Sequence, residues 1–282
     1  MTGFINVNKA CGVSSAREVG RIKKLLNTPC GHMGTLDPLA TGVLPVAVGN
    51  AARLFDYFLD KRKTYVAVFD FGIDSDTLDV TGNMTERFGR IPSEDEILSV
   101  LGEFVGEINQ IPPKYSAKNI SGKRGYELAR AGVEFELPPK KVNIYSVKLI
   151  KKCSDTGFAF EIECGGGTYI RSIARDLAKR LNTVAIMSSL VRTKSGIFSV
   201  DTAVETDRLT AENIKDFLIP TETVLPFGSY TPDVKTAKKL FNGLSAECSL
   251  ADGTYKIFTP EGSFYGLAEV GKSYIKVRTK LC

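Results

Sequence analysis

The sequence predicts a mixed α+β protein with a small β-rich module at its C-terminal end. Two segments, residues 65–71 and 158–164, alternate apolar and polar residues with period two, as half-buried strands do. Two others, residues 15–26 and 170–181, carry apolar residues at helical spacing. After residue 223, three short strand-like runs are separated by turn residues, which is typical of a small β domain.

The composition is that of an ordinary globular protein. The chain has 282 residues, of which 43% are hydrophobic and 24% charged, enough for one large domain and a small one. A net charge of +5 favours nucleic acid only weakly, but basic clusters interleaved with tyrosines recur between residues 61 and 152. Solvated surface is the alternative for any one cluster.

Several classes of protein are disfavoured by the same composition. The six cysteines contain no CxxC pair, and a single histidine cannot complete a multi-histidine site, so we expect neither zinc nor a disulfide framework. No apolar stretch approaches membrane-spanning length, and the N-terminus lacks the pattern of a secretory signal. We therefore expect a cytoplasmic protein that does not engage a membrane.

The first elements follow from local patterns. We expect a strand at residues 4–7, and then a helix to residue 26 that is opened by Ser15 and Glu18 at capping-box spacing. A strand at 43–48, a helix capped by Asn50 and the strand at 65–71 come next. Residues 72–82 are polar and rich in aspartate, but they lack the spacing of a calcium loop, so we expect no metal there.

The remaining elements lie on either side of a basic segment at residues 109–135. A capped helix opens at Pro92 and runs to residue 104, and residues 109–135 are basic and aromatic, with a short helix that ends at Gly132. The strand at 158–164 leads through three glycines into the helix at 170–181. A glycine-rich turn of this kind can bind phosphate, but the Walker lysine and the GxGxxG spacing are missing, so a nucleotide cofactor is disfavoured. We place a domain boundary near 220–230, followed by a helix at 235–242 and strands at 255–258, 264–267 and 274–277.

One loop carries the residues best suited to chemistry. Its sequence is Gly31-His32-Met33-Gly34-Thr35-Leu36-Asp37-Pro38-Leu39-Ala40-Thr41-Gly42-Val43-Leu44-Pro45, which includes the only histidine. Pro38 steers Asp37 out of the α region, so Asp37 is expected on a loop. An Asp-Pro turn that merely joins two elements is the alternative.

This loop resembles the GHxGTLDPxATGxLP signature of the TruB family of tRNA pseudouridine-55 synthases, in its bacterial stand-alone form. The similarity covers the chain to about residue 200, and the C-terminal tail more loosely resembles a PUA-like RNA-binding module. The further matching segments are residues 8–15, 63–65, 110–117, 167–171 and 190–193.

The resemblance implies a fold, a reaction and a partner. It implies a pseudouridine synthase fold with a mostly antiparallel sheet flanked by helices in residues 1–222, a flexible flap at about 114–135, and a PUA-like domain at 223–282. It also implies that uridine 55 in the T-loop of tRNA is detached at N1, turned and rejoined through C5, without cofactor or metal. The expected partner is the T-arm and elbow of tRNA, bound by a monomer that needs no protein partner.

The same resemblance assigns the catalytic residues. Asp37 is the nucleophile, because a carboxylate can add to the substrate and later leave. Arg171 matches the arginine that pairs with it, although a purely structural salt bridge predicts the same contact. Tyr65 matches the tyrosine that stacks on uracil, with a core tyrosine as the alternative.

The resemblance also assigns residues that bind the substrate. His32 and Tyr169 match positions that contact the substrate, and Leu190 matches an apolar wall, where a base flipped from its loop regains stacking. The candidate RNA contacts are Lys9, Lys63, Lys114, Lys118, Lys123 and Arg124.

The chain departs from the family pattern at a few positions. Ala10-Cys11, Asn119 and Val191 differ from the usual residues at positions that pack or contact RNA backbone, so they bear on affinity and not on chemistry. Two alternatives stay open: a tRNA-binding folding helper, and a synthase that acts on another structured RNA. Leu39-Ala40-Thr41-Gly42 is of the stand-alone type and not the guide-RNA-dependent type.

Overall fold

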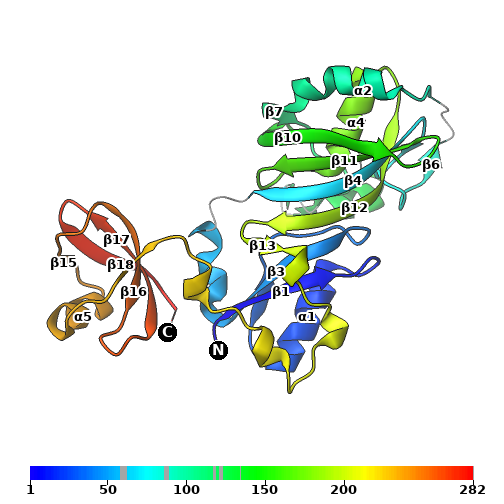
Figure 1. Ribbon diagram of the computed structural model, residues 1–282. Helices are drawn as coiled ribbons and strands as arrows, with labels where there is room; N and C mark the ends of the chain where they lie inside the picture. Colours follow the sequence, from blue (N-terminus) through cyan, green and yellow to red (C-terminus); the bar gives the residue numbers. More distant parts are fainter. Residues whose placement is uncertain (58–61, 86–88, 117–118, 121–122, 134, 282) are drawn as a thin grey trace.

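The computed structural model describes residues 1–57, 62–85, 89–116, 119–120, 123–133 and 135–281. They form two main β-sheets that lie side by side, each with its own helices (Figure 1), and two small two-stranded sheets. The larger sheet has the strand order β1-β3-β12-β4-β11-β10-β7, with β2 paired to β3 and β13 paired to β12. Its pairs are antiparallel except for a short parallel contact between β12 and β3. The predicted mixed α+β architecture with a mostly antiparallel sheet is therefore confirmed.

The bounds of the elements in this first part follow the chain. The strands of the large sheet are β1 Gly3–Lys9, β2 Cys30–His32, β3 Thr41–Val48, β4 Lys63–Phe71, β7 Gly106–Gln110, β10 Lys140–Lys152, β11 Gly157–Cys164, β12 Ala185–Ser195 and β13 Phe198–Ser199. Two small hairpins are β5 Asp74–Ser75 with β6 Met84–Thr85, and β8 Asn119–Ile120 with β9 Lys123–Arg124. The helices are α1 Ser15–Leu26, α2 Glu94–Leu101, α3 Gly125–Arg130 and α4 Ile170–Arg180, and the 3₁₀ segments are η1 Gly49–Tyr57, η2 Gly102–Phe104, η3 Val200–Thr202, η4 Thr206–Arg208, η5 Ile214–Phe217 and η6 Thr221–Thr223.

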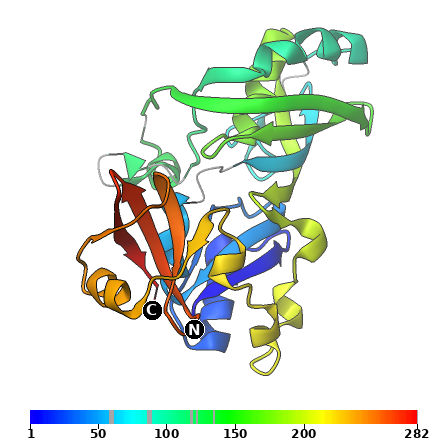
Figure 2. The ribbon, with the colours of Figure 1, turned by 60° about the vertical axis from the view of Figure 1, so that its left-hand side comes forward.

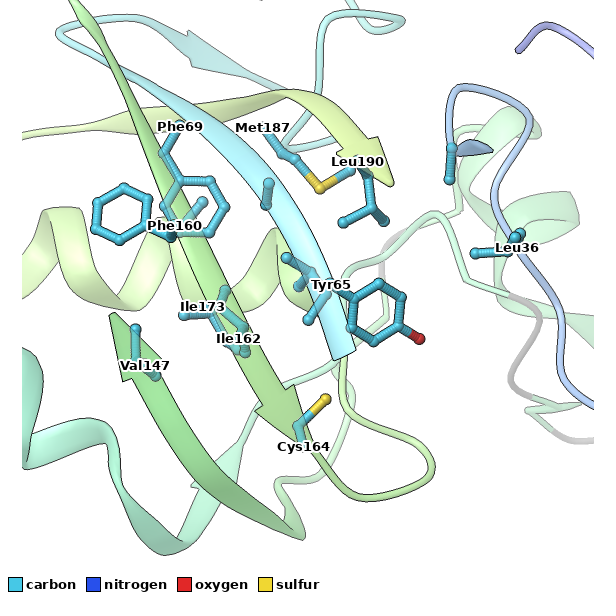
Figure 3. Close-up of a cluster of buried hydrophobic side chains, with 14 of the residues drawn as sticks. Leu36, Tyr65, Phe69, Val147, Phe160, Ile162, Cys164, Ile173, Met187 and Leu190 are labelled. Atoms are coloured by element: carbon cyan, nitrogen blue, oxygen red, sulfur yellow. The ribbon is translucent and has the colours of Figure 1, made fainter. Parts of the chain in front are cut away.

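Strand alternation divides the apolar side chains between two faces of the large sheet. In β1, Ile5 faces the main core, whereas Phe4 faces a second cluster on the other side. Helices α2 and α4 pack on β10, β4 and β12, and α1 packs on β2 and β3 (Figure 1). Stacked rings of Phe69 and Phe160, with centroids 4.8 Å apart, lie inside the main core (Figure 3). Tyr65 and Leu36 belong to this core and also line the candidate site (Figure 3).

The helix α1 begins differently from the prediction. Its N-cap is Ser14, whose hydroxyl accepts a hydrogen bond from the backbone N–H of Arg17, and the helix itself starts at Ser15. Glu18 hydrogen-bonds the hydroxyl of Thr206 at 2.5 Å. The predicted capping box at Ser15 and Glu18 is therefore wrong, because tertiary partners take both side chains. The capped helix predicted after Pro92 is confirmed as α2, with a complete capping box between Ser93 and Glu96.

Two long strands were not predicted. The register of β12 against β4 shifts between Met187 and Ser189 and again between Arg192 and Lys194. The register of β10 against β11 also shifts twice. Each bulge inserts an extra residue and so interrupts the period-two pattern by which a strand is recognised. The helix predicted after Asn50 is the 3₁₀ segment η1.

The C-terminal sheet has the order β14-β16-β17-β18-β15 and packs against the first part of the chain (Figure 2). An apolar cluster that includes Phe4, Val43 and Leu54 from one side and Leu267 and Leu281 from the other joins the two parts. Among the described residues, no helix has the length and apolar character needed to cross a membrane. The elements are β14 Gly228–Tyr230, α5 Val234–Phe241, β15 Ala246–Glu247, β16 Gly253–Phe258, β17 Phe264–Gly271 and β18 Tyr274–Lys280.

Candidate active site

Asp37 lies on the loop between β2 and β3, and its neighbours fix that loop from several sides. The hydroxyl of Ser15 donates to the carbonyl of Leu36 and accepts from its N–H, both at 2.9 Å. The carbonyl of Asp37 accepts from the N–H of Ala40 at 3.0 Å, which closes a tight turn around Pro38. The Asp37 side chain remains 37% exposed. The loop thus presents a carboxylate to solvent on a backbone that is held in place.

The buried ammonium of Lys9 anchors this turn from below. Its Nζ donates to the carbonyls of Ala10, Val13 and Pro38 at 2.8, 2.7 and 3.1 Å. Burial lowers the pKa of Lys9, and the carbonyl oxygens provide the partners that a buried cation requires. Lys9 is 0% exposed and has no surface to offer a phosphate. The prediction that Lys9 contacts RNA is therefore wrong; the residue supports the Asp37 loop instead.

Arg192 holds the same loop from the sheet side. It is fully buried on β12, and its Nε donates to the carbonyl of Val43 at 2.6 Å. Its Nη2 donates to the carbonyl of Gly34 at 3.0 Å. The two buried cations together fix the backbone before and after Asp37. The sequence analysis did not assign a role to Arg192, because nothing local reveals which carbonyls a distant strand will reach.

Arg171 brings a guanidinium to Asp37. Nη2 lies 2.9 Å from Oδ2 of Asp37, and Nη1 lies 3.4 Å from Oδ2 of Asp79. The guanidinium also donates to the carbonyls of Thr77 and Tyr115 at 3.0 and 3.1 Å. Because Arg171 is only 5% exposed, these four contacts fix its position. The structure thus brings the two predicted catalytic residues of opposite charge into direct contact.

Asp79 is a functional candidate that the sequence analysis missed. It is 4% exposed, and its Oδ1 accepts from Oγ1 of Thr77 at 2.8 Å and from the N–H of Thr81 at 2.9 Å. Its Oδ2 is left to face Arg171. The sequence analysis weighed this aspartate only as part of a possible calcium loop. The flanking threonines, two residues to either side, were the one local sign of a carboxylate fixed within a turn.

A pocket of about 420 Å³ opens beside the Asp37–Arg171 pair. This volume lies within the usual range for small-ligand sites. Tyr65 and Leu190 form its apolar side, and Figure 3 shows the Tyr65 ring directed towards the loop that carries Leu36, with Leu190 nearby. Burial raises the pKa of Tyr65, so its hydroxyl stays protonated at neutral pH. Among the described residues, no group of three or more His, Cys, Asp or Glu side chains could hold a metal ion.

Tyr169 lies at the pocket wall and is held through its backbone. It is the N-cap residue of α4. The amide of Gln110 accepts from its N–H at 2.8 Å and donates to its carbonyl at 3.1 Å. Gln110 is itself buried at the end of β7. This pairing fixes the start of the helix, and with it the position of Arg171, two residues after Tyr169.

His32 is not among the described residues that line the pocket. It lies at the end of β2, opposite Val46, and its Nδ1 is buried without a hydrogen-bond partner in the described part of the chain. Burial lowers the pKa of His32, and nearby Arg192 and Lys63 lower it further, so the ring is neutral at pH 7. Its predicted contact with substrate stays a prediction.

The predicted RNA-binding residues are distributed around the pocket. Lys63 lines it, and Lys114 is exposed on the segment that follows β7. Lys118 lies outside the described residues, as do the side chains of Lys123 and Arg124. The predictions for these residues stay predictions.

Comparison with known proteins gives consistent similarities. Residues 23–170 match the family model described as TruB family pseudouridylate synthase (N terminal domain). The tRNA pseudouridine synthase B of Caldicellulosiruptor saccharolyticus is 39% identical over 243 residues, covering 86% of this chain and 83% of that protein. The enzyme of the same name from Clostridium kluyveri is 34% identical over 275 residues, covering 95% of both chains. A solved Cbf5-Nop10-Gar1 complex contains a chain with a TM-score of 0.71 and 24% identity, covering 99% of this chain and 85% of that one, which shows a shared fold.

Proposed function

The chain belongs to the TruB family of pseudouridylate synthases, and we propose that it converts uridine 55 in the T-loop of tRNA to pseudouridine. The proposal is supported by relatives named tRNA pseudouridine synthase B that are 34–44% identical. The observation that carries it is the Asp37–Arg171 contact of 2.9 Å at a pocket lined by Tyr65.

In this proposal Asp37 is the nucleophile. The bond between C1′ of the ribose and N1 of uracil breaks, the base turns, and a new bond joins C1′ to C5; C5 loses its proton and N1 gains one, so the product is an isomer of the substrate. The carboxylate adds either to the base or to C1′ and leaves at the end, which divides one difficult step into easier ones. The guanidinium of Arg171 stabilises the negative charge and aims the carboxylate. The change is redox-neutral, so the chain's own side chains suffice and no cofactor is required.

The pocket favours a flipped base. A T-loop uridine stacked inside the RNA cannot reach Asp37, so it must leave its stack. The ring of Tyr65 and the side chain of Leu190 offer apolar surface to the uracil in place of its lost neighbours. Tyr169 lines the same pocket. We assign His32, at the end of β2, a contact with the RNA outside this pocket. Because the nucleophile, its partner and the stacking surface are all present, catalysis is favoured over a purely tRNA-folding role.

We propose that the protein is a cytoplasmic monomer and that both of its domains contact tRNA. Residues 1–222 are the catalytic domain and residues 223–282 a PUA-like domain that touches the acceptor stem. The first strand of the C-terminal sheet, β14, begins at Gly228, shortly after this boundary. The flap predicted at about residues 114–135 lies partly outside the described residues and stays a prediction. Lys63 and Lys114 are among the proposed RNA contacts. A synthase that acts on another structured RNA is the alternative.

The proposal is tested with an unmodified tRNA transcript. The full-length protein is incubated with the transcript, and pseudouridine is mapped at single-nucleotide resolution. We expect one pseudouridine at position 55, and none in a matched transcript with cytidine at that position, because the cytosine ring cannot yield pseudouridine. Pseudouridine at another site, or none at all, would contradict the assignment.

A further inference from the structure

The topology of the large sheet places two lysines at the mouth of the pocket. Lys63 begins β4 and Lys140 begins β10, while Cys164 ends the strand β11 that lies between them. Because β11 is antiparallel to both neighbours, the starts of β4 and β10 and the end of β11 share one edge of the sheet. Both lysines line the same pocket as Asp37. The two ammonium groups therefore lie at the opening through which a nucleotide would enter.

The ammonium groups of Lys140 and Lys63 each lie close to a glycine, and the two glycines belong to different loops. A Cβ atom at Gly167, on the turn between β11 and α4, would lie 2.7 Å from Nζ of Lys140. A Cβ atom at Gly34, on the Asp37 loop, would lie 3.0 Å from Nζ of Lys63. A Cβ atom at Gly167 would displace the Lys140 ammonium, and one at Gly34 would crowd the Lys63 ammonium, so each cation lies directly against the backbone of its glycine. Gly34 also has a φ of +146°, which a side chain would strain.

The adjacent residue, Lys141, differs from Lys140 in direction and in partner. Lys141 points to the other side of β10 and pairs with Glu107 at 2.7 Å. Lys140 forms no ion pair with the residues that the structure describes, and it is exposed at the pocket rim. A cation in this position is available for an anion that accompanies the ligand. For a nucleotide within RNA, that anion is a backbone phosphate.

We propose that Lys140 and Lys63 form a phosphate clamp at the pocket mouth, which holds the two phosphates on either side of the flipped nucleotide. The proposal rests on the proposed function, since it takes the occupant of the pocket to be a nucleotide in an RNA chain. Holding both phosphates fixes the sugar between them and so sets the position of C1′ relative to Asp37. The clamp contacts the phosphates of the RNA and not the base. It therefore contributes affinity and positions the nucleotide, but it does not select a sequence.

The clamp is tested by binding of a T-arm hairpin RNA to the full-length protein in an Asp37→Asn background, which should bind the hairpin without converting it. The hairpin is compared with versions that carry a neutral methylphosphonate at the linkage 5′ or 3′ of the target uridine. We expect each of these replacements to weaken binding about tenfold, as the loss of a charge-assisted contact does. Adding Lys140→Met should weaken binding of the unmodified hairpin by a similar factor and remove the sensitivity to one linkage, and Lys63→Met should remove the sensitivity to the other. The log-log slope of affinity against salt should fall in magnitude by about 0.7 to 0.9.

Two control variants separate a phosphate contact from a general charge effect. Lys141→Met removes the same charge one residue away and should leave the response to both methylphosphonates unchanged. Lys140→Arg keeps the charge and should retain the sensitivity to the linkage. If the effects of Lys140→Met and of each methylphosphonate simply add, or if Lys141→Met behaves like Lys140→Met, the clamp is refuted. These outcomes do not depend on whether the wild-type protein forms pseudouridine, so the two proposals fail separately.

Discussion

Arg171 lies between two carboxylates, and only Asp37 lines the pocket. Asp79 holds the other side of the guanidinium and is itself fixed by Thr77 and Thr81. A buried guanidinium without this second carboxylate would keep fewer of its contacts and could turn away from Asp37. Asp79 therefore positions Arg171, which in turn positions the nucleophile.

This role of Asp79 can be measured. Asp79→Asn keeps the shape of the side chain but removes its charge. We expect kcat to fall about 10²-fold while tRNA binding changes little, because a small displacement of the reacting groups is costly. Asp74→Asn, in the same turn, is the control and should retain activity. A large loss of tRNA affinity with unchanged kcat would show that Asp79 serves binding instead.

The residues of the site were predictable to different degrees. Asp37, Tyr65 and Arg171 belong to short motifs that the sequence displays, and the structure places all three at one pocket. Asp79 and Arg192 act through contacts made by distant segments, so no local pattern reveals them. Lys9 illustrates the same point, since its charge indicated RNA until its burial and three carbonyl partners were known.

At the scale of the element, the Asp37 loop is fixed by its neighbours more than by its own sequence. Strand β1 contributes Lys9, helix α1 contributes Ser15 and strand β12 contributes Arg192. Strand β12 lies between β3 and β4, so it is held on both sides. Its bulges explain why it was not predicted. Strands β4 and β11 were predicted, because β4 alternates along most of its length and β11 alternates in its second half. The loop can thus be rigid although it is irregular.

The support of this loop by Lys9 predicts a loss of stability. Lys9→Met leaves three carbonyls without their donor, and we expect unfolding in urea to show a loss of about 2 to 4 kcal/mol. An exposed lysine on α1, Lys24, is the control, and Lys24→Met should change the free energy of unfolding by less than about 0.5 kcal/mol. If Lys9→Met leaves stability intact and only lowers the salt dependence of RNA binding, the lysine contacts RNA after all.

At the scale of the whole molecule, the C-terminal sheet is joined to the face of β1 and β3 that lies opposite the main core. The apolar cluster around Phe4, Val43 and Leu267 joins the two parts, and the side chain of Asn50 donates to the carbonyl of Leu281 at 3.0 Å. The edge of β1 is also covered, through bridges to Val204 and Ile219. The sequence indicated a β-rich module after residue 223, but its packing partners are set by long-range apolar contacts that no local pattern shows.

The central claim is that Asp37 is the nucleophile of a whole-tRNA reaction, and one substitution tests it most directly. Asp37→Asn preserves the size of the side chain and removes its nucleophilic charge. In single-turnover assays on full-length tRNA transcript, we expect pseudouridine formation to fall by at least about 10⁴-fold, while the Kd for tRNA stays within about threefold. Formation of pseudouridine by Asp37→Asn at a rate within tenfold of the wild type would contradict the account.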